Sequence, residues 1–158
     1  MNKLLLVVLS SLLLICSFFS NAYFANENTT IMVENSYARE SIPGTSISSA
    51  YMTLKNTSSA NVKLIAASSS VSKRVEIHQH TMENGLMKMR QRDDVEIAAN
   101  DHVIFQPSGF HLMIFDLKKP LKANSNIIIT LHFDDQSSVD VNYLVKGLKQ
   151  KKKHHHHH

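Results

Sequence analysis

Short apolar stretches, many of them β-branched, recur along the chain, and residues that favour turns separate them. Asn, Ser, Asp, Gly and Pro close the stretches, and no segment keeps the 3.6-residue apolar period of an amphipathic helix. The expected strands are 31–38, 48–55, 62–68, 72–80, 86–91, 94–98, 102–106, 110–116, 126–133 and 138–145. Roughly ten short strands at this spacing predict an all-β fold, either a sandwich or a small barrel.

The N-terminal segment, residues 1–22, has the pattern of a secretory signal peptide. Lys3 supplies the positive charge, residues 4–19 are mostly apolar, and Ala22 ends a small-residue cleavage site, with Ala25 as a second candidate. The apolar run is at the short limit for crossing a bilayer, so an export signal is favoured over a membrane anchor. We therefore expect an exported chain with no stable membrane insertion after cleavage.

The cysteine content removes several classes of chemistry. Cys16 is the only cysteine and lies inside the signal, so the exported chain has no thiol and no disulfide. Cysteine nucleophiles, zinc–cysteine sites and the cysteine-ligated blue-copper centre are therefore excluded. A lipid anchor is disfavoured, because Ile15 stands where a lipoprotein signal needs a small residue. The sequence has no GxSxG, P-loop, GxGxxG or HExxH motif, and we expect no enzymatic activity.

The C-terminal segment, residues 149–158, is a Lys/His tail that is either a native extension or an expression tag. A run of imidazoles binds Cu(II), so the tail is a possible secondary metal site formed by His154, His155, His156, His157 and His158. Five of the 17 basic residues lie in the two end segments, whereas all 13 acidic residues lie in the single β-domain 23–148. That domain is close to neutral, and we expect no nucleic-acid partner.

Strand alternation within residues 75–91 gathers histidine and methionine on one face. His78, His80 and Met82 lie on the face opposite Val75 and Ile77, and the Asn-Gly dipeptide at 84–85 predicts a two-residue hairpin. In that register one face of the hairpin carries three cross-strand pairs, which are Met82 with Met87, His80 with Met89 and His78 with Gln91.

A second segment, residues 110–116, repeats the pattern, because His111 and Met113 lie on the face opposite its apolar residues. Thioether sulfur is soft and suits Cu(I), while imidazole binds copper in either oxidation state. A thiol would bind Cu(I) more tightly, but outside the cytosol it is open to oxidation. The two His/Met faces therefore predict a Cu(I) site.

The spacing of these residues resembles a known signature. His78, ten residues, Met89, twenty-one residues, His111, one residue and Met113 is similar to the H-x10-M-x21-H-x-M pattern of the PCuAC family of periplasmic copper chaperones. The flanking segments 75–78 and 107–113 also resemble that family, and the resemblance covers about residues 31 to 147.

The resemblance implies a cupredoxin-like Greek-key β-barrel or sandwich that binds one Cu(I) through His78, Met89, His111 and Met113. It also implies a periplasmic chaperone that delivers copper to the copper-A site of cytochrome c oxidase subunit II, alongside Sco-type proteins. We expect the chain to be a monomer. A periplasmic copper or silver reservoir in metal tolerance is the alternative function, and a structural β-sandwich with an accidental His/Met face is the third interpretation.

Several residues outside the expected ligand set are given secondary or structural roles. His80, Met82 and Met87 are possible secondary copper ligands, in a supporting or transfer role. Glu76 and Arg90 are expected to pair across the hairpin. A third set, His102 and His132, is expected to be structural or solvated.

Overall fold

The computed structural model describes residues 30–147, and within that range it contains ten β-strands and no helix. The strands are β1 (Ile31–Arg39), β2 (Ser48–Asn56), β3 (Val62–Ser68), β4 (Arg74–Glu83), β5 (Leu86–Gln91), β6 (Val95–Ile97), β7 (His102–Phe105), β8 (Phe110–Phe115), β9 (Asn126–Phe133) and β10 (Ser138–Lys146). Each expected strand is present, and the main difference is that β4 extends to Glu83. The all-β prediction is confirmed.

The signal peptide expected at 1–22 and the tail at 149–158, with His154 to His158, lie outside the described residues. Within residues 30–147 the structure has no helix with the length and apolar character of a membrane span.

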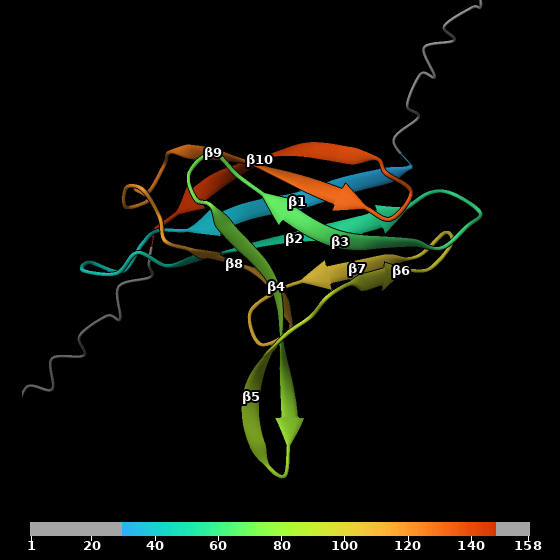
Figure 1. The fold of residues 1–158 in the computed structure, drawn as a ribbon, viewed down its shortest axis with the longest axis horizontal. Coiled ribbons are helices and arrows are strands. Elements are labelled where there is room, and N and C mark those ends of the chain that lie inside the picture. The colour runs from blue at the N-terminus through green and yellow to red at the C-terminus, as the bar shows by residue number, and fades with distance from the viewer. Residues whose placement is uncertain (1–29, 148–158) are drawn as a thin grey trace, which may run out of the picture.

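All ten strands form one mixed sheet in the order β5-β4-β8-β7-β2-β1-β10-β9-β3-β6, with an additional pairing between β8 and β2. The β1–β10 and β7–β8 pairs are parallel and the other pairs are antiparallel. Figure 1 shows the sheet curled into a barrel-like body, from which the β4–β5 hairpin projects. The strands that carry the expected ligands, β5, β4 and β8, are neighbours at one end of the strand order.

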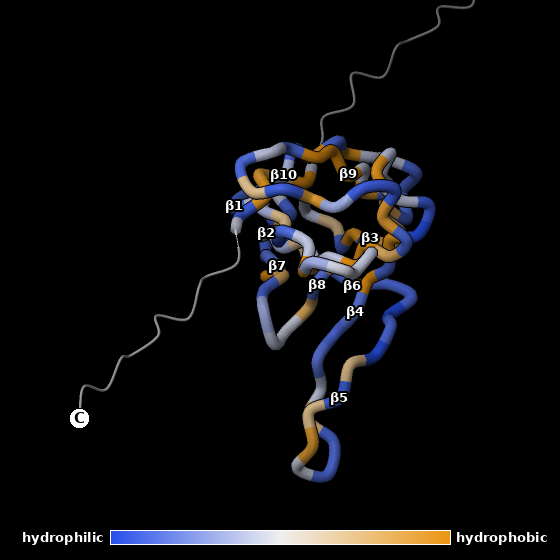
Figure 2. Tube along the Cα trace, turned by 90° about the vertical axis from the view of Figure 1, so that its left-hand side faces the viewer, coloured by the Kyte–Doolittle hydropathy of each residue, from blue (hydrophilic) through white to orange (hydrophobic). Residues whose placement is uncertain are grey.

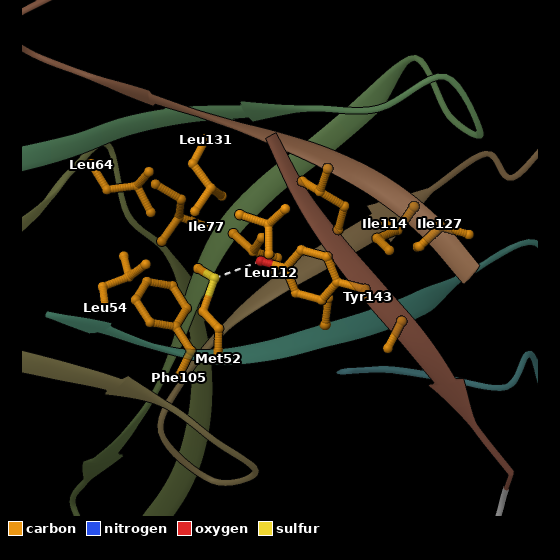
Figure 3. Close-up of a cluster of buried hydrophobic side chains, with 14 of the residues drawn as sticks. Met52, Leu54, Leu64, Ile77, Phe105, Leu112, Ile114, Ile127, Leu131 and Tyr143 are labelled. Atoms are coloured by element: carbon orange, nitrogen blue, oxygen red, sulfur yellow. Dashed lines mark hydrogen bonds between the residues drawn. The ribbon is translucent and has the colours of Figure 1, made fainter. Parts of the chain in front are cut away.

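The core lies inside the curled sheet, where β4 and β8 face β3 and β9. Ile77 of β4 and Leu112 of β8 lie near Leu64 and Leu131, all of them buried (Figure 3). Because strand side chains alternate between faces, burying Ile77 and Leu112 places their neighbours His78 and His111 on the outer face. Core packing therefore orients the candidate site.

The β4–β5 hairpin extends beyond the core as a two-stranded ribbon (Figure 2). Its turn has Asn84 at φ 52° and Gly85 at φ 76°. Positive φ at both central residues defines a type I′ turn, whose twist matches that of the flanking strands. The turn sets the register that the sequence predicts, with Met82 opposite Met87 and His80 opposite Met89.

Candidate metal centre

The expected ligands occupy three adjacent strands on one face of the sheet. His78 of β4 is the register partner of His111 of β8, and their ring centroids are 6.0 Å apart. Toward the hairpin, His80 is opposite Met89 of β5. In the other direction, Met113 is opposite Glu76. The two methionines thus flank the His78–His111 pair. Each is displaced from it along the strand direction by about 6.6–6.8 Å, the spacing of successive residues on one face of a strand.

His78 is held by a carboxylate on its own strand. Its Nε2 lies 2.8 Å from Oε2 of Glu76, and Arg74 pairs with the other Glu76 oxygen at 3.5 Å. A carboxylate beside a ring nitrogen stabilises the proton there, so Nε2 donates and Nδ1 keeps its lone pair. His78 Nδ1 is buried and has no hydrogen-bond partner among the described residues.

His111 uses the other ring nitrogen, Nδ1, for its hydrogen bond. Its Nδ1 lies 3.1 Å from the carbonyl oxygen of Gly109, so Nδ1 donates and Nε2 keeps the lone pair. Nε2 is buried without a hydrogen-bond partner within residues 30–147, and the whole residue is 3% exposed. Burial lowers the pKa of His111, and the neighbouring His80 and His78 lower it further, against the opposing effect of the Gly109 carbonyl. The neutral, metal-binding form is therefore favoured.

His80 is closer to the centre of the site than the sequence indicated. Its ring stacks on that of His111 with centroids 4.9 Å apart, and its Nδ1 is also buried with no partner in the described part of the chain. On the other side of His111, the buried Tyr51 ring lies at 6.4 Å. Three imidazoles thus gather on one face, each with an unused buried nitrogen.

The two methionines differ in accessibility. Met89 is 45% exposed on the projecting hairpin. Met113 is half-buried and lines a surface hollow of about 330 Å³ together with Ile42, Ile47 and Ser49. One thioether is therefore open to solvent, whereas the other belongs to the wall of the body. Among residues 30–147 no group of three or more His, Cys, Asp or Glu side chains is arranged to hold a metal.

The expected Glu76–Arg90 pair is wrong. Arg90 is opposite Gln79, on the other face of the ribbon from Glu76, and it pairs with Glu83 at 2.9 Å. Hydrogen bonds from Arg90 and then Lys88 lower the pKa of the Glu83 carboxyl to about 2. Glu76 instead holds His78. Strand alternation already placed both residues on one face, but the sequence pattern did not predict their contact.

The remaining histidines of the described domain lie apart from this face. His102 is solvent-exposed and 3.3 Å from Asp101, and His132 bonds to the Ser68 hydroxyl at 2.8 Å. Both agree with the structural or solvated role expected for them.

Comparison with solved structures defines the class of this fold. A copper-bound PCuAC domain from PmoF2 is 20% identical, with a TM-score of 0.65, over 75% of this chain and 94% of that domain. CuI-DR1885 from Deinococcus radiodurans is 28% identical, with a TM-score of 0.59, over 75% of this chain and 81% of that one. The chain therefore has the cupredoxin-like β-fold of PCuAC domains, as expected.

Its sequence identifies the family. The chain belongs to the LpqE-like family, whose model carries a lipoprotein name and matches residues 31–145. Lxx21020 of Leifsonia xyli subsp. xyli, also named as a lipoprotein, is 32% identical over 104 residues, 65% of this chain and 63% of its own length. The uncharacterized protein RP573 of Rickettsia prowazekii is 37% identical over 99 residues, 62% of this chain and 55% of its own. The match spans less than two thirds of either relative, and the lipoprotein names point to an exported protein.

Proposed function

We propose that this protein is an exported copper chaperone that carries one Cu(I) on His78, Met89, His111 and Met113. One observation carries the proposal: each of the two facing imidazoles uses one ring nitrogen in a hydrogen bond and keeps the other buried without a partner in the described domain. A buried, unpaired nitrogen costs free energy unless a ligand uses it. One metal ion coordinated by both rings would occupy these two nitrogens, His78 Nδ1 and His111 Nε2.

The donor types select the metal and its oxidation state. Two thioethers beside two imidazoles favour Cu(I) over Zn²⁺, Mg²⁺ and Ca²⁺, which prefer thiolate, imidazole or oxygen donors. Four protein donors leave no open coordination position of the kind that a catalytic metal site keeps. Because Met89 lies on an exposed strand, an incoming ligand of a recipient protein can replace it first. The set thus suits binding and release rather than catalysis.

The destination of the copper is a further part of the proposal. The signature spacing, together with the PCuAC-like fold, supports delivery to the copper-A site of cytochrome c oxidase subunit II in cooperation with Sco-type proteins. The protein is exported to the periplasm and cleaved after Ala22 or Ala25, and the lipoprotein name of its family supports export. Because Ile15 precedes Cys16, the mature chain is released and carries no lipid at Cys16. We propose that it acts there as a monomer.

A competition titration with bathocuproine disulfonate under reducing conditions tests the binding site. His78→Gln, His111→Gln, Met89→Leu and Met113→Leu should each weaken Cu(I) binding, because each removes one donor while the leucine variants keep the volume nearly constant. His102→Gln and Met32→Leu are matched controls, since both residues are exposed and remote from the site. X-ray absorption should show sulfur together with nitrogen, and a shell of nitrogen and oxygen alone would refute the assignment.

A deletion strain tests the cellular role. Cytochrome c oxidase activity should fall at limiting copper and recover partly when copper is added. Normal oxidase activity combined with lost copper tolerance would instead favour the reservoir function. Unchanged behaviour in both assays would leave the His/Met face without a role in copper handling.

A further inference from the structure

The soft donors of the hairpin do not stop at Met89. One step nearer the tip, Met82 of β4 is directly opposite Met87 of β5, on the same face as the His80–Met89 pair. Met82 is 67% exposed and Met87 is 56% exposed. The face therefore continues as a ladder of His and Met pairs from the body of the protein to the end of the ribbon.

The two faces of the ribbon are sorted by chemistry. All charged side chains between residues 78 and 91 lie on the opposite face, where Glu83 pairs with Arg90 at 2.9 Å and with Lys88 at 3.1 Å. The His/Met face carries only neutral groups there. The hairpin projects from the body (Figure 2), so Met82 and Met87 are not packed against the core. Core packing therefore does not account for these two large, exposed apolar side chains.

We propose that Met82 and Met87, together with His80, form a second, outer Cu(I) site through which copper enters and leaves the inner one. This inference rests on the proposed Cu(I) site. Two thioethers and one imidazole are a donor set of the same soft type, without thiolate or carboxylate. His80 is suited to a position between the outer and the inner site, because its Nδ1 has no partner in the described domain and its ring stacks on His111 of the inner set at 4.9 Å.

The spacing of the ladder allows stepwise transfer. Successive same-face residues on a strand are about 6.6–6.8 Å apart, so the Met82–Met87 pair is one step from the His80–Met89 pair, which adjoins the inner set. The ion can exchange one thioether or imidazole for the next without being released to water. Transfer changes neither the oxidation state nor the number of protons bound, because thioethers and neutral imidazoles are the donors at both ends.

A titration of the full mature chain, tail included, with Cu(I) under reducing conditions tests the outer site. The ε-methyl groups of the methionines are labelled with ¹³C and followed by NMR. The first equivalent should move the signals of Met89 and Met113, and a later equivalent should move those of Met82 and Met87. Met32, exposed on β1, is the internal control and should not move.

The Met82→Leu/Met87→Leu double variant separates the outer site from the inner one. It should bind one Cu(I) fewer than the wild type while keeping its affinity for the first, and it should pass that copper to bathocuproine disulfonate more slowly. Met32→Leu should match the wild type in all three respects. His80→Gln should lose the later equivalent.

Different results would refute the outer and the inner copper site. Signals of Met82 and Met87 that stay fixed in excess Cu(I), or a double variant with unchanged stoichiometry and transfer rate, would overturn the outer site. Failure of Met89 and Met113 to respond to the first equivalent would instead refute the inner site.

Discussion

His78 lies directly opposite His111 across the β4–β8 pair, with ring centroids 6.0 Å apart and ring planes inclined by 39°. The pairing joins a projecting hairpin to a strand of the body, so neither element holds both imidazoles alone. The proposed copper site therefore exists only when β4 and β8 are paired.

The first prediction concerns the carboxylate that holds His78. Glu76→Leu removes the acceptor at His78 Nε2 and should lower Cu(I) affinity about 10- to 100-fold, the usual effect of losing a partner that orients a metal-binding histidine. Glu76→Gln keeps an acceptor oxygen and should retain most of the affinity. Competition with bathocuproine disulfonate measures both. Glu83→Gln, on the other face of the ribbon, should bind as the wild type does. Equal affinity in Glu76→Leu and the wild type would remove Glu76 from the site.

The second prediction concerns a buried hydroxyl in the core. The Tyr143 hydroxyl donates to the sulfur of Met52 at 2.6 Å, and burial raises the pKa of Tyr143 well above its ordinary value (Figure 3). Above pH about 10 ionisation of this tyrosine stabilises the unfolded chain, whereas burial opposes the same ionisation in the folded chain. Stability should therefore fall more steeply with rising pH in the wild type than in Tyr143→Phe, as measured by urea unfolding between neutral and alkaline pH. Parallel curves would contradict the assignment.

The third prediction concerns Asn56, which is fully buried at the end of β2. Its amide nitrogen donates to the carbonyl oxygens of Ala60, Ile97 and Ala98, and its oxygen accepts from Ser58. Asn56→Leu leaves these groups unpaired and should lower the free energy of unfolding by about 2–3 kcal/mol.

Urea unfolding of the apo protein measures this change. Asn142→Leu, at an exposed position of β10, is the matched control and should stay within about 0.5 kcal/mol of the wild type. A loss at Asn56 no larger than that of the control would show that the buried network contributes little.

The fourth prediction concerns the tail. His154 to His158 should bind Cu(II) independently of the inner site, because imidazoles without thioethers suit Cu(II). Binding requires neutral imidazole, so this uptake should weaken as the pH falls through about 6.5. Titration of the mature chain against a variant that ends at Gly147 measures the difference. If both take up equal amounts of Cu(II) with the same pH profile, the tail has no role in copper binding.

The sequence by itself determined the features that depend on neighbours along the chain. Alternation of apolar and polar residues placed the ten strands, and it placed His78, His80 and Met82 on one face. The Asn84-Gly85 turn determined the hairpin register, since Asn-Gly strongly favours the two-residue type I′ turn, whose twist matches that of the flanking strands. Local backbone preference suffices for each of these.

The tertiary structure alone decided which strands meet and what each ring contacts. Packing of Ile77 and Leu112 against the strands from the other end of the sheet places β4 beside β8, and with it His78 opposite His111. The contacts of Glu76 with His78 and of His80 with His111 depend on side-chain rotamers chosen within that packing. The pairing of segments distant in the chain is set by how the whole core is buried, and no local residue pattern specifies that.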